Sequence, residues 1–186
     1  MAVLCWPALA AAHADAPSAA GLLAGLLHPV SGADHVLAMV AVGLWGAQLG
    51  APALWRLPLV FPMVMAMGGA LALAGVPLPG AEVGIALSAL GLGAAVLTAW
   101  RPPFAIAALV VGAFAIFHGH AHGTELPPGA SGLAYSLGFV VATGLLHALG
   151  IAIGSVQRWP RGRAMLRAAG GAVAAAGLGF LWRALA

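Results

Sequence analysis

The residues that could do chemistry in this chain are histidines and carboxylates that interrupt apolar sequence. His28, Asp34 and His35 lie inside one long hydrophobic stretch, together with Pro29 and Gly32. On a straight helix, His28 and His35 share a face but are separated by about 10 Å of rise. Pro29 removes a backbone donor and Gly32 loosens the next turn. We therefore expect the helix to break between His28 and Gly32. That break would bring all three groups to one metal ion; the alternative is a buried pair in which Asp34 orients His35 for packing.

A second cluster, from Phe117 to Glu125, holds three histidines and a glutamate within nine residues. On a helix, His118, His122 and Glu125 stand at i, i+4 and i+7 on one face, whereas His120 points to the opposite side. If the glycines of this cluster break the helix, the stretch would instead wrap an ion as a loop. The alternative interpretation is a solvent-facing histidine tract that merely scavenges metal.

Three further residues are secondary candidates. His147 stands alone in an apolar segment, where a histidine is either an interhelical hydrogen-bonding residue or a ligand. Glu82 opens another segment, where an acid also complements the helix dipole. His13 lies near the N-terminus.

The donor set limits which ion these residues would hold. Imidazole with carboxylate suits zinc, nickel, copper or ferrous iron, whereas hard ions need more oxygen ligands. The single cysteine, Cys5, lies outside the expected membrane spans, which argues against a cuprous site. From the donor set alone we expect a late divalent transition metal.

The composition places these residues in a membrane protein. Of 186 residues, 6% are charged and 63% are hydrophobic, and the mean hydropathy is +1.06. A soluble domain of this size needs a polar shell that so few charges cannot supply. A chain with no lysine and one cysteine is not a nucleic-acid binder or a disulfide scaffold.

The expected fold class is all-α: a polytopic bundle of six transmembrane helices with a broken first helix. Apolar runs near 20 residues are long enough to cross a bilayer, and proline-rich connections separate them. Residues 1–12 resemble a signal peptide, with cleavage after Ala12 or Ala14, and residues 13–186 form one transmembrane domain. The six expected segments are Ser18 to Leu49, Leu57 to Ala74, Ala81 to Ala99, Pro103 to His120, Ala130 to Gly154 and Arg163 to Leu185.

Arginine placement predicts the orientation. With the N-terminus outside, six of the seven arginines fall on the cytoplasmic side and only Arg183 falls outside. The sequence therefore predicts a bacterial inner-membrane protein whose mature N-terminus and C-terminus are both periplasmic.

The sequence also has features of two other functional classes. Ser131 sits in a Gly-x-Ser-Gly string like that of rhomboid proteases, but about 24 Å of helix separates it from His147, so an enzyme is not expected. A membrane metal-binding chaperone or sensor for metalloenzyme assembly, without transport, stays open. The chain has no ATP-binding loop, so any transport is secondary.

The motifs resemble a known family. His28 to Trp45, which reads His-Pro-x-Ser-Gly-x-Asp-His and continues with an apolar run, is similar to the HupE/UreJ family of hydrogenase and urease accessory proteins. The resemblance extends to Phe61-Pro62, to Glu82 and to the histidine cluster ending at Glu125. It implies nickel uptake through six spans to supply hydrogenase or urease maturation, with the metal transported rather than held as a permanent cofactor. It also implies that His28, Asp34, His35, His122 and Glu125 are functional, with Glu82 and Phe61 in support.

Together these patterns predict one divalent-ion site that joins the first and fourth segments. The outer histidines would catch the ion and pass it inward to Asp34 and His35, with His147 as a deeper station. Because neutral imidazoles bind metal, uptake should fall as pH drops through about 6.5. Related nickel and cobalt transporters have four residues in the His-to-Asp gap where this chain has five, so nickel, cobalt and zinc all stay open.

Overall fold

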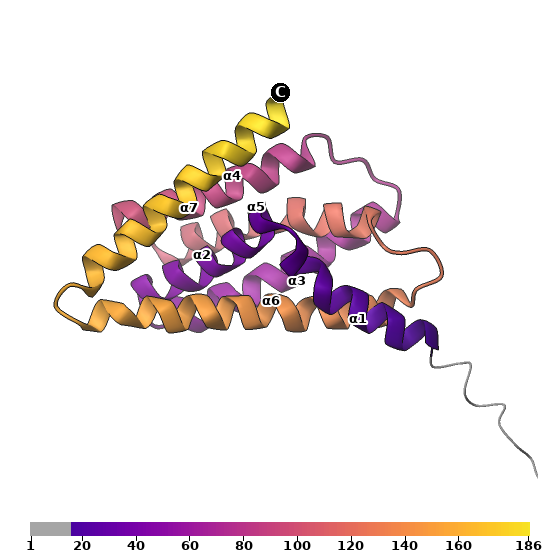
Figure 1. The fold of residues 1–186 in the computed structure, drawn as a ribbon, viewed down its shortest axis with the longest axis horizontal. Coiled ribbons are helices and arrows are strands. Elements are labelled where there is room, and N and C mark those ends of the chain that lie inside the picture. Colours follow the sequence, from indigo (N-terminus) through magenta and orange to yellow (C-terminus); the bar gives the residue numbers. More distant parts are fainter. Residues whose placement is uncertain (1–15) are drawn as a thin grey trace, which may run out of the picture.

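A computed structural model describes residues 16–186, which form helices and short connections and contain no strand. The predicted signal peptide and His13 lie outside the described residues. In chain order the elements are α1 (Ala16–Ser31), α2 (Ala33–Leu49), α3 (Ala53–Leu73), α4 (Ala81–Thr98), α5 (Phe104–Thr124), α6 (Gly132–Gly154), the short 3₁₀ helix η1 (Ser155–Arg158) and α7 (Gly162–Leu185) (Figure 1).

The described helices give six candidate membrane spans when the broken pair at the start is counted as one span. Helices α3, α4, α5, α6 with its η1 extension, and α7 are each long and apolar enough to cross a bilayer. The sixth span is the pair α1 and α2, whose axes bend by 83° at their junction. This elbow lies near the middle of the bundle, with α1 running along α6 (Figure 1).

The break lies at the end of the predicted stretch. Helix α1 continues through Pro29 to Ser31, and only Gly32 leaves helical geometry, with φ −106° and ψ 121°. The Ser31 hydroxyl donates to the His28 carbonyl at 2.6 Å, which satisfies an acceptor that the end of the helix leaves free.

Two helix ends differ from the sequence-based segments. Helix α3 begins at Ala53 rather than Leu57, and α5 continues to Thr124 rather than ending at His120. Gly119 and Gly123 do not break α5. They face the backbone of α3 so closely that a Cβ would collide with it, and this packing keeps the last turns helical.

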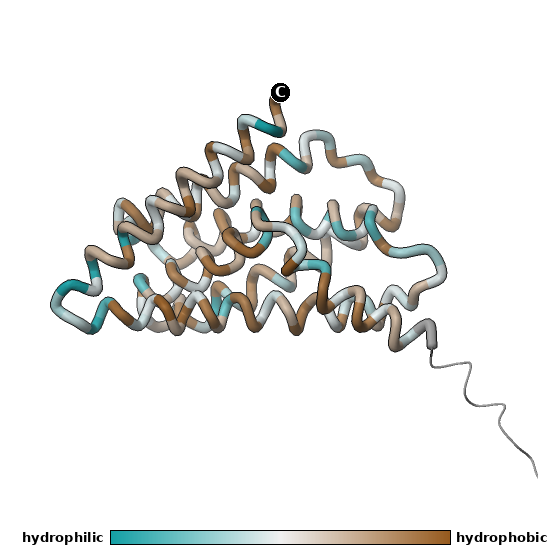
Figure 2. The backbone as a smooth tube through the Cα atoms, in the orientation of Figure 1, coloured by the Kyte–Doolittle hydropathy of each residue, from teal (hydrophilic) through white to brown (hydrophobic). Residues whose placement is uncertain are grey.

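Helix α2 forms the centre of the bundle. Met39, Val42 and Trp45 are fully buried, and α2 packs against α3, α4 and α6. Gly43 of α2 lies against the backbone of His147 with no room for a Cβ, so α2 and α6 approach closely. Hydrophilic residues gather at the α6–α7 turn and, toward the other end, around the elbow and the end of α5 (Figure 2).

Candidate metal centre

The elbow places Asp34 and His35 in the first turn of α2. Asp34 Oδ1 accepts hydrogen bonds from the His35 backbone N–H and from His35 Nδ1, both at 2.8 Å. A Cβ at position 32 would come within 2.8 Å of that carboxylate oxygen and 3.1 Å of His35 Nδ1. Glycine at position 32 therefore leaves the space in which this pair forms.

The end of α5 carries two buried histidines one turn apart. His118 is fully buried and His122 is 5% exposed, and both rings point toward His35. The stretch is therefore a helix and not a loop that wraps an ion, and His118 and His122 lie on one face of it as their spacing predicts.

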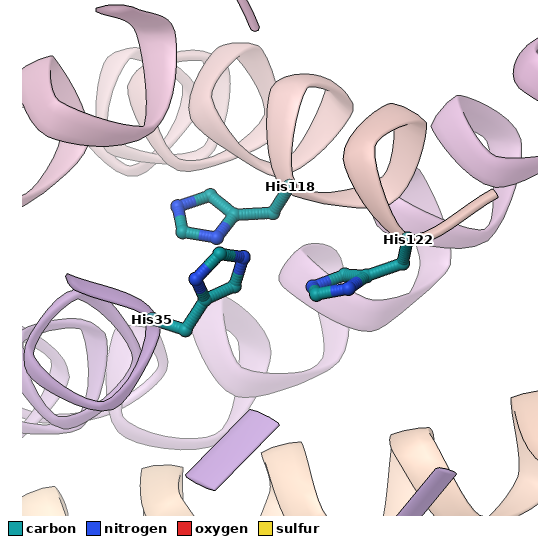
Figure 3. Close-up of side chains that lie close together, drawn as sticks. All are labelled: His35, His118 and His122. Atoms are coloured by element: carbon teal, nitrogen blue, oxygen red, sulfur yellow. The ribbon is translucent and has the colours of Figure 1, made fainter. Parts of the chain in front are cut away.

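His35, His118 and His122 meet to form what we call the three-histidine cluster. One ring nitrogen from each lies within 4.8 Å of the others. The His35 ring centroid is 4.7 Å from that of His118 and 4.6 Å from that of His122. Figure 3 shows the three rings converging from α2 and α5.

A serine on α4 determines which ring nitrogen of His118 carries the proton. Ser88 Oγ lies 2.6 Å from the Ile85 carbonyl oxygen and 2.8 Å from His118 Nε2. Two oxygens this close require a proton between them, so the single hydroxyl proton goes to Ile85. His118 Nε2 must then donate to Ser88, and its Nδ1 carries the lone pair. That Nδ1 is buried and has no hydrogen-bond partner.

The carboxylate of Asp34 fixes which ring nitrogen of His35 carries the proton. An ionised carboxylate only accepts, so His35 Nδ1 donates and Nε2 carries the lone pair. His35 Nε2 and both ring nitrogens of His122 are buried without partners. Three unpaired imidazole lone pairs therefore converge, which suits a late transition metal. A ligating imidazole held by a carboxylate through its other nitrogen is common at such sites.

A second, more exposed group shares His122. His28, His122 and Glu125 bring ligand atoms within 4.8 Å of one another. His28 Nε2 lies 2.9 Å from Glu125 Oε2, and His122 Nδ1 lies 3.7 Å from the same oxygen. Glu125 follows the last turn of α5 and is half exposed, and the neighbouring His122 and His28 hold its pKa below its usual value.

A polar cavity of about 440 Å³ opens onto these groups. Asp34, Glu82 and Glu125, the three carboxylates of the described residues, all line it together with His35. Arg183, near the end of α7, lines it as well. We call it the outer cavity; it brings Glu82 of α4 to the site although Glu82 makes no hydrogen bond there.

The whole chain can be compared with known proteins. Residues 1–180 match the family described as HupE / UreJ protein. The chain belongs to the HupE/UreJ family. It is 48% identical to Protein HupE of Rhizobium leguminosarum bv. viciae over 181 residues, which cover 97% of this chain and 94% of that protein. No solved structure matches. The HupE/UreJ proteins are hydrogenase and urease accessory proteins, and this member is a multi-pass membrane protein.

Two of the secondary candidates of this HupE/UreJ chain lie apart from the cluster. His120 Nε2 donates to the Val76 carbonyl at 2.8 Å, so it fastens the α3–α4 connection to the opposite face of α5. His147 is buried on α6. Its ring centroid is 5.3 Å from that of Phe61, which in turn is 5.4 Å from that of His118.

Sequence reasoning did not find Ser88 or Arg183 as site residues. The available signal for Ser88 was its hydroxyl in the middle of the apolar sequence of α4, because polar groups inside membrane helices usually have a partner. In the sequence, Arg183 stands out only as the one arginine on the periplasmic side of the predicted topology. Asp34, expected among the ligands, has one oxygen engaged by His35 and also fits the alternative of an orienting group.

Proposed function

We propose that this protein carries a divalent transition metal, nickel in first place, into the cell by secondary transport, and so supplies hydrogenase or urease maturation. One observation carries the proposal: three unpaired imidazole nitrogens converge beneath an acid-lined cavity in a membrane-spanning bundle. Membership of the HupE/UreJ family supports the link to hydrogenase and urease.

The ligand set fits an ion that must be released again. Three neutral nitrogens select a late transition metal over magnesium or calcium. Glu125 is 53% exposed and the second group opens to the outer cavity, so the ligands do not close into a cage. A site that binds enough to capture the ion and not enough to trap it is what conduction requires.

The direction of transport is inferred from charge. Arg56, Arg101 and Arg167 lie at the end of the bundle away from the outer cavity, as do the three arginines of the α6–α7 turn. Positively charged ends face the cytoplasm. The outer cavity then opens to the periplasm, and the ion enters there.

The test is nickel flux into proteoliposomes that contain the purified protein and an internal nickel-sensitive dye. We expect uptake by the wild type and its loss in His35→Ala, with His120→Asn as a matched control outside the cluster. Cobalt and zinc are compared at equal concentration to rank the cargo. Nickel binding in detergent without any flux would favour the chaperone or sensor alternative and would overturn transport.

A further inference from the structure

His147 is a buried polar side chain that the three-histidine cluster does not use. It is 1% exposed, and neither Nδ1 nor Nε2 has a hydrogen-bond partner. One helical turn earlier on α6, the Thr143 hydroxyl is fully buried and also unpaired. Native proteins pair nearly all their buried polar groups, because an unpaired group loses its hydrogen bonds to water without replacement. Helix α6 therefore presents two costly, unexplained polar groups on one face.

A third polar group faces His147 from α3. Pro62 has no backbone N–H, so the carbonyl of Pro58, four residues earlier, lacks its helical donor. That carbonyl lies beside the His147 ring, although neither ring nitrogen has a hydrogen-bond partner. One imidazole nitrogen and two neutral oxygens form a donor set for a divalent transition ion that is weaker than three imidazoles.

The Phe61 ring separates this set from the three-histidine cluster. Phe61 is fully buried, and its ring makes edge contacts with both the His118 ring and the His147 ring. Within the described part of the chain, no direct ring contact joins those two histidines. An apolar ring between two groups of ligands blocks a hydrated ion until the ring moves.

We infer that His147, the Thr143 hydroxyl and the Pro58 carbonyl form a second, inner site for the transported ion, and that Phe61 is the barrier between the two sites. This inference rests on the proposed function. A weaker set of ligands beyond the barrier would let the ion move from the three-histidine cluster toward the cytoplasm without being trapped.

The decisive variant is His147→Leu, measured for nickel affinity in detergent and for flux in proteoliposomes. Leucine removes both unpaired nitrogens, so a purely structural histidine would be replaced with equal or greater thermal stability and full flux. The inner site predicts instead unchanged nickel affinity at the three-histidine cluster and a maximal flux lowered about tenfold or more. Thr143→Val should lower the flux less, and Thr143→Ser should restore it.

Full flux in His147→Leu overturns the inner site while leaving the proposed function intact, whereas absent flux in the wild type overturns the proposed function. If His147→Leu does not yield folded, nickel-binding protein, His147→Phe, which also offers no ligand atom, is measured in the same way and is interpreted by the same outcomes.

A spectroscopic test of the inner site does not require transport. Cys5 is the only cysteine of the chain, so Cys5→Ser with His147→Cys leaves one thiol at the inner site. Added cobalt should then give a thiolate-to-cobalt charge-transfer band. Cys5→Ser with Leu146→Cys, the adjacent position on α6, should give none. Absence of the band from the His147→Cys protein overturns the inner site.

Discussion

Two hydrogen bonds decide which nitrogens the three-histidine cluster offers to an ion. Ser88 Oγ accepts a hydrogen bond from His118 Nε2–H, and Asp34 Oδ1 accepts one from His35 Nδ1–H. Each bond fixes both the tautomer and the orientation of a ring. In the proposed site these two residues would position ligands, and each makes a separate prediction.

Ser88→Ala should weaken nickel binding about tenfold, because His118 loses the acceptor that fixes its tautomer and its ring orientation. Ser88→Thr keeps the hydroxyl and should retain most of the affinity. Calorimetry on the purified protein measures both. Ser155→Ala, at the other end of the bundle, serves as the control for loss of a serine hydroxyl, and equal affinity in Ser88→Ala and Ser155→Ala would contradict this role.

Asp34→Asn should abolish nickel uptake while the protein stays folded in the membrane. The amide can still accept one hydrogen bond from His35, but it removes the negative charge that raises the basicity of the ring and offsets the charge of the ion. Uptake into proteoliposomes is compared with the amount of protein recovered and its melting temperature. Normal transport by both Asp34→Asn and His35→Ala would mean that the intramembrane site does not act as described.

The elbow between α1 and α2 and the close packing of α3 on α5 bring the ligands together. Gly32 provides the space for Asp34, and Gly119 and Gly123 bring α5 against α3. Gly32 has an ordinary negative φ, so alanine fits its backbone and only the side chain would interfere.

Gly32→Ala should lower nickel affinity about tenfold with little change in stability, because the new methyl group displaces the Asp34 carboxylate from His35. Gly144→Ala is the matched control: a Cβ there meets nothing within 4 Å, and the substitution should leave binding unchanged. Both are measured as nickel affinity and melting temperature in detergent. Unaltered affinity in Gly32→Ala would show that the carboxylate tolerates the methyl group.

The sequence predicts most of these elements because their signals are local. Apolar runs separated by prolines give six spans, and the spacing of His118 and His122 places them on one face. The contacts of Ser88 and Phe61 could not be predicted, since they join residues about 30 to 90 positions apart through helix packing. The exact break could not be predicted either, because Pro29 is accommodated in α1 and the bend occurs at Gly32.

At the scale of the whole molecule, charge is arranged along the bundle axis. The arginine-rich end and the acid-lined outer cavity lie at opposite ends, and Arg183 is the exception that lines the cavity. This arrangement leads to two predictions. One concerns the orientation of the protein in the membrane, and the other concerns the concentration at which the cavity captures the ion.

A reporter fused after Gly162 should be active only when it is of the kind that works in the cytoplasm, because that turn follows Arg158 and Arg161. The same reporters fused after Ala186 should give the opposite pattern. Periplasmic activity after Gly162 would reverse the proposed direction of transport.

Arg183→Gln should lower the KM for nickel uptake about two- to fivefold at low ionic strength, because it removes a positive charge from a cavity lined by three carboxylates. The effect should shrink as salt is added. Arg161→Gln, exposed at the other end of the bundle, is the control and should leave the KM unchanged. A KM that is identical in Arg183→Gln and wild type would remove Arg183 from the capture step.

The tautomers set by Ser88 and Asp34 have a consequence for energetics. Because both rings already present a lone pair while neutral, the ion binds them without displacing a proton. A transported divalent ion then carries two uncompensated charges across the bilayer. The membrane potential contributes about 2.3 kcal/mol per charge for each 100 mV, or about 4.6 kcal/mol for this ion. An inside-negative voltage would by itself concentrate the metal in the cell, with no proton or sodium gradient and no ATP.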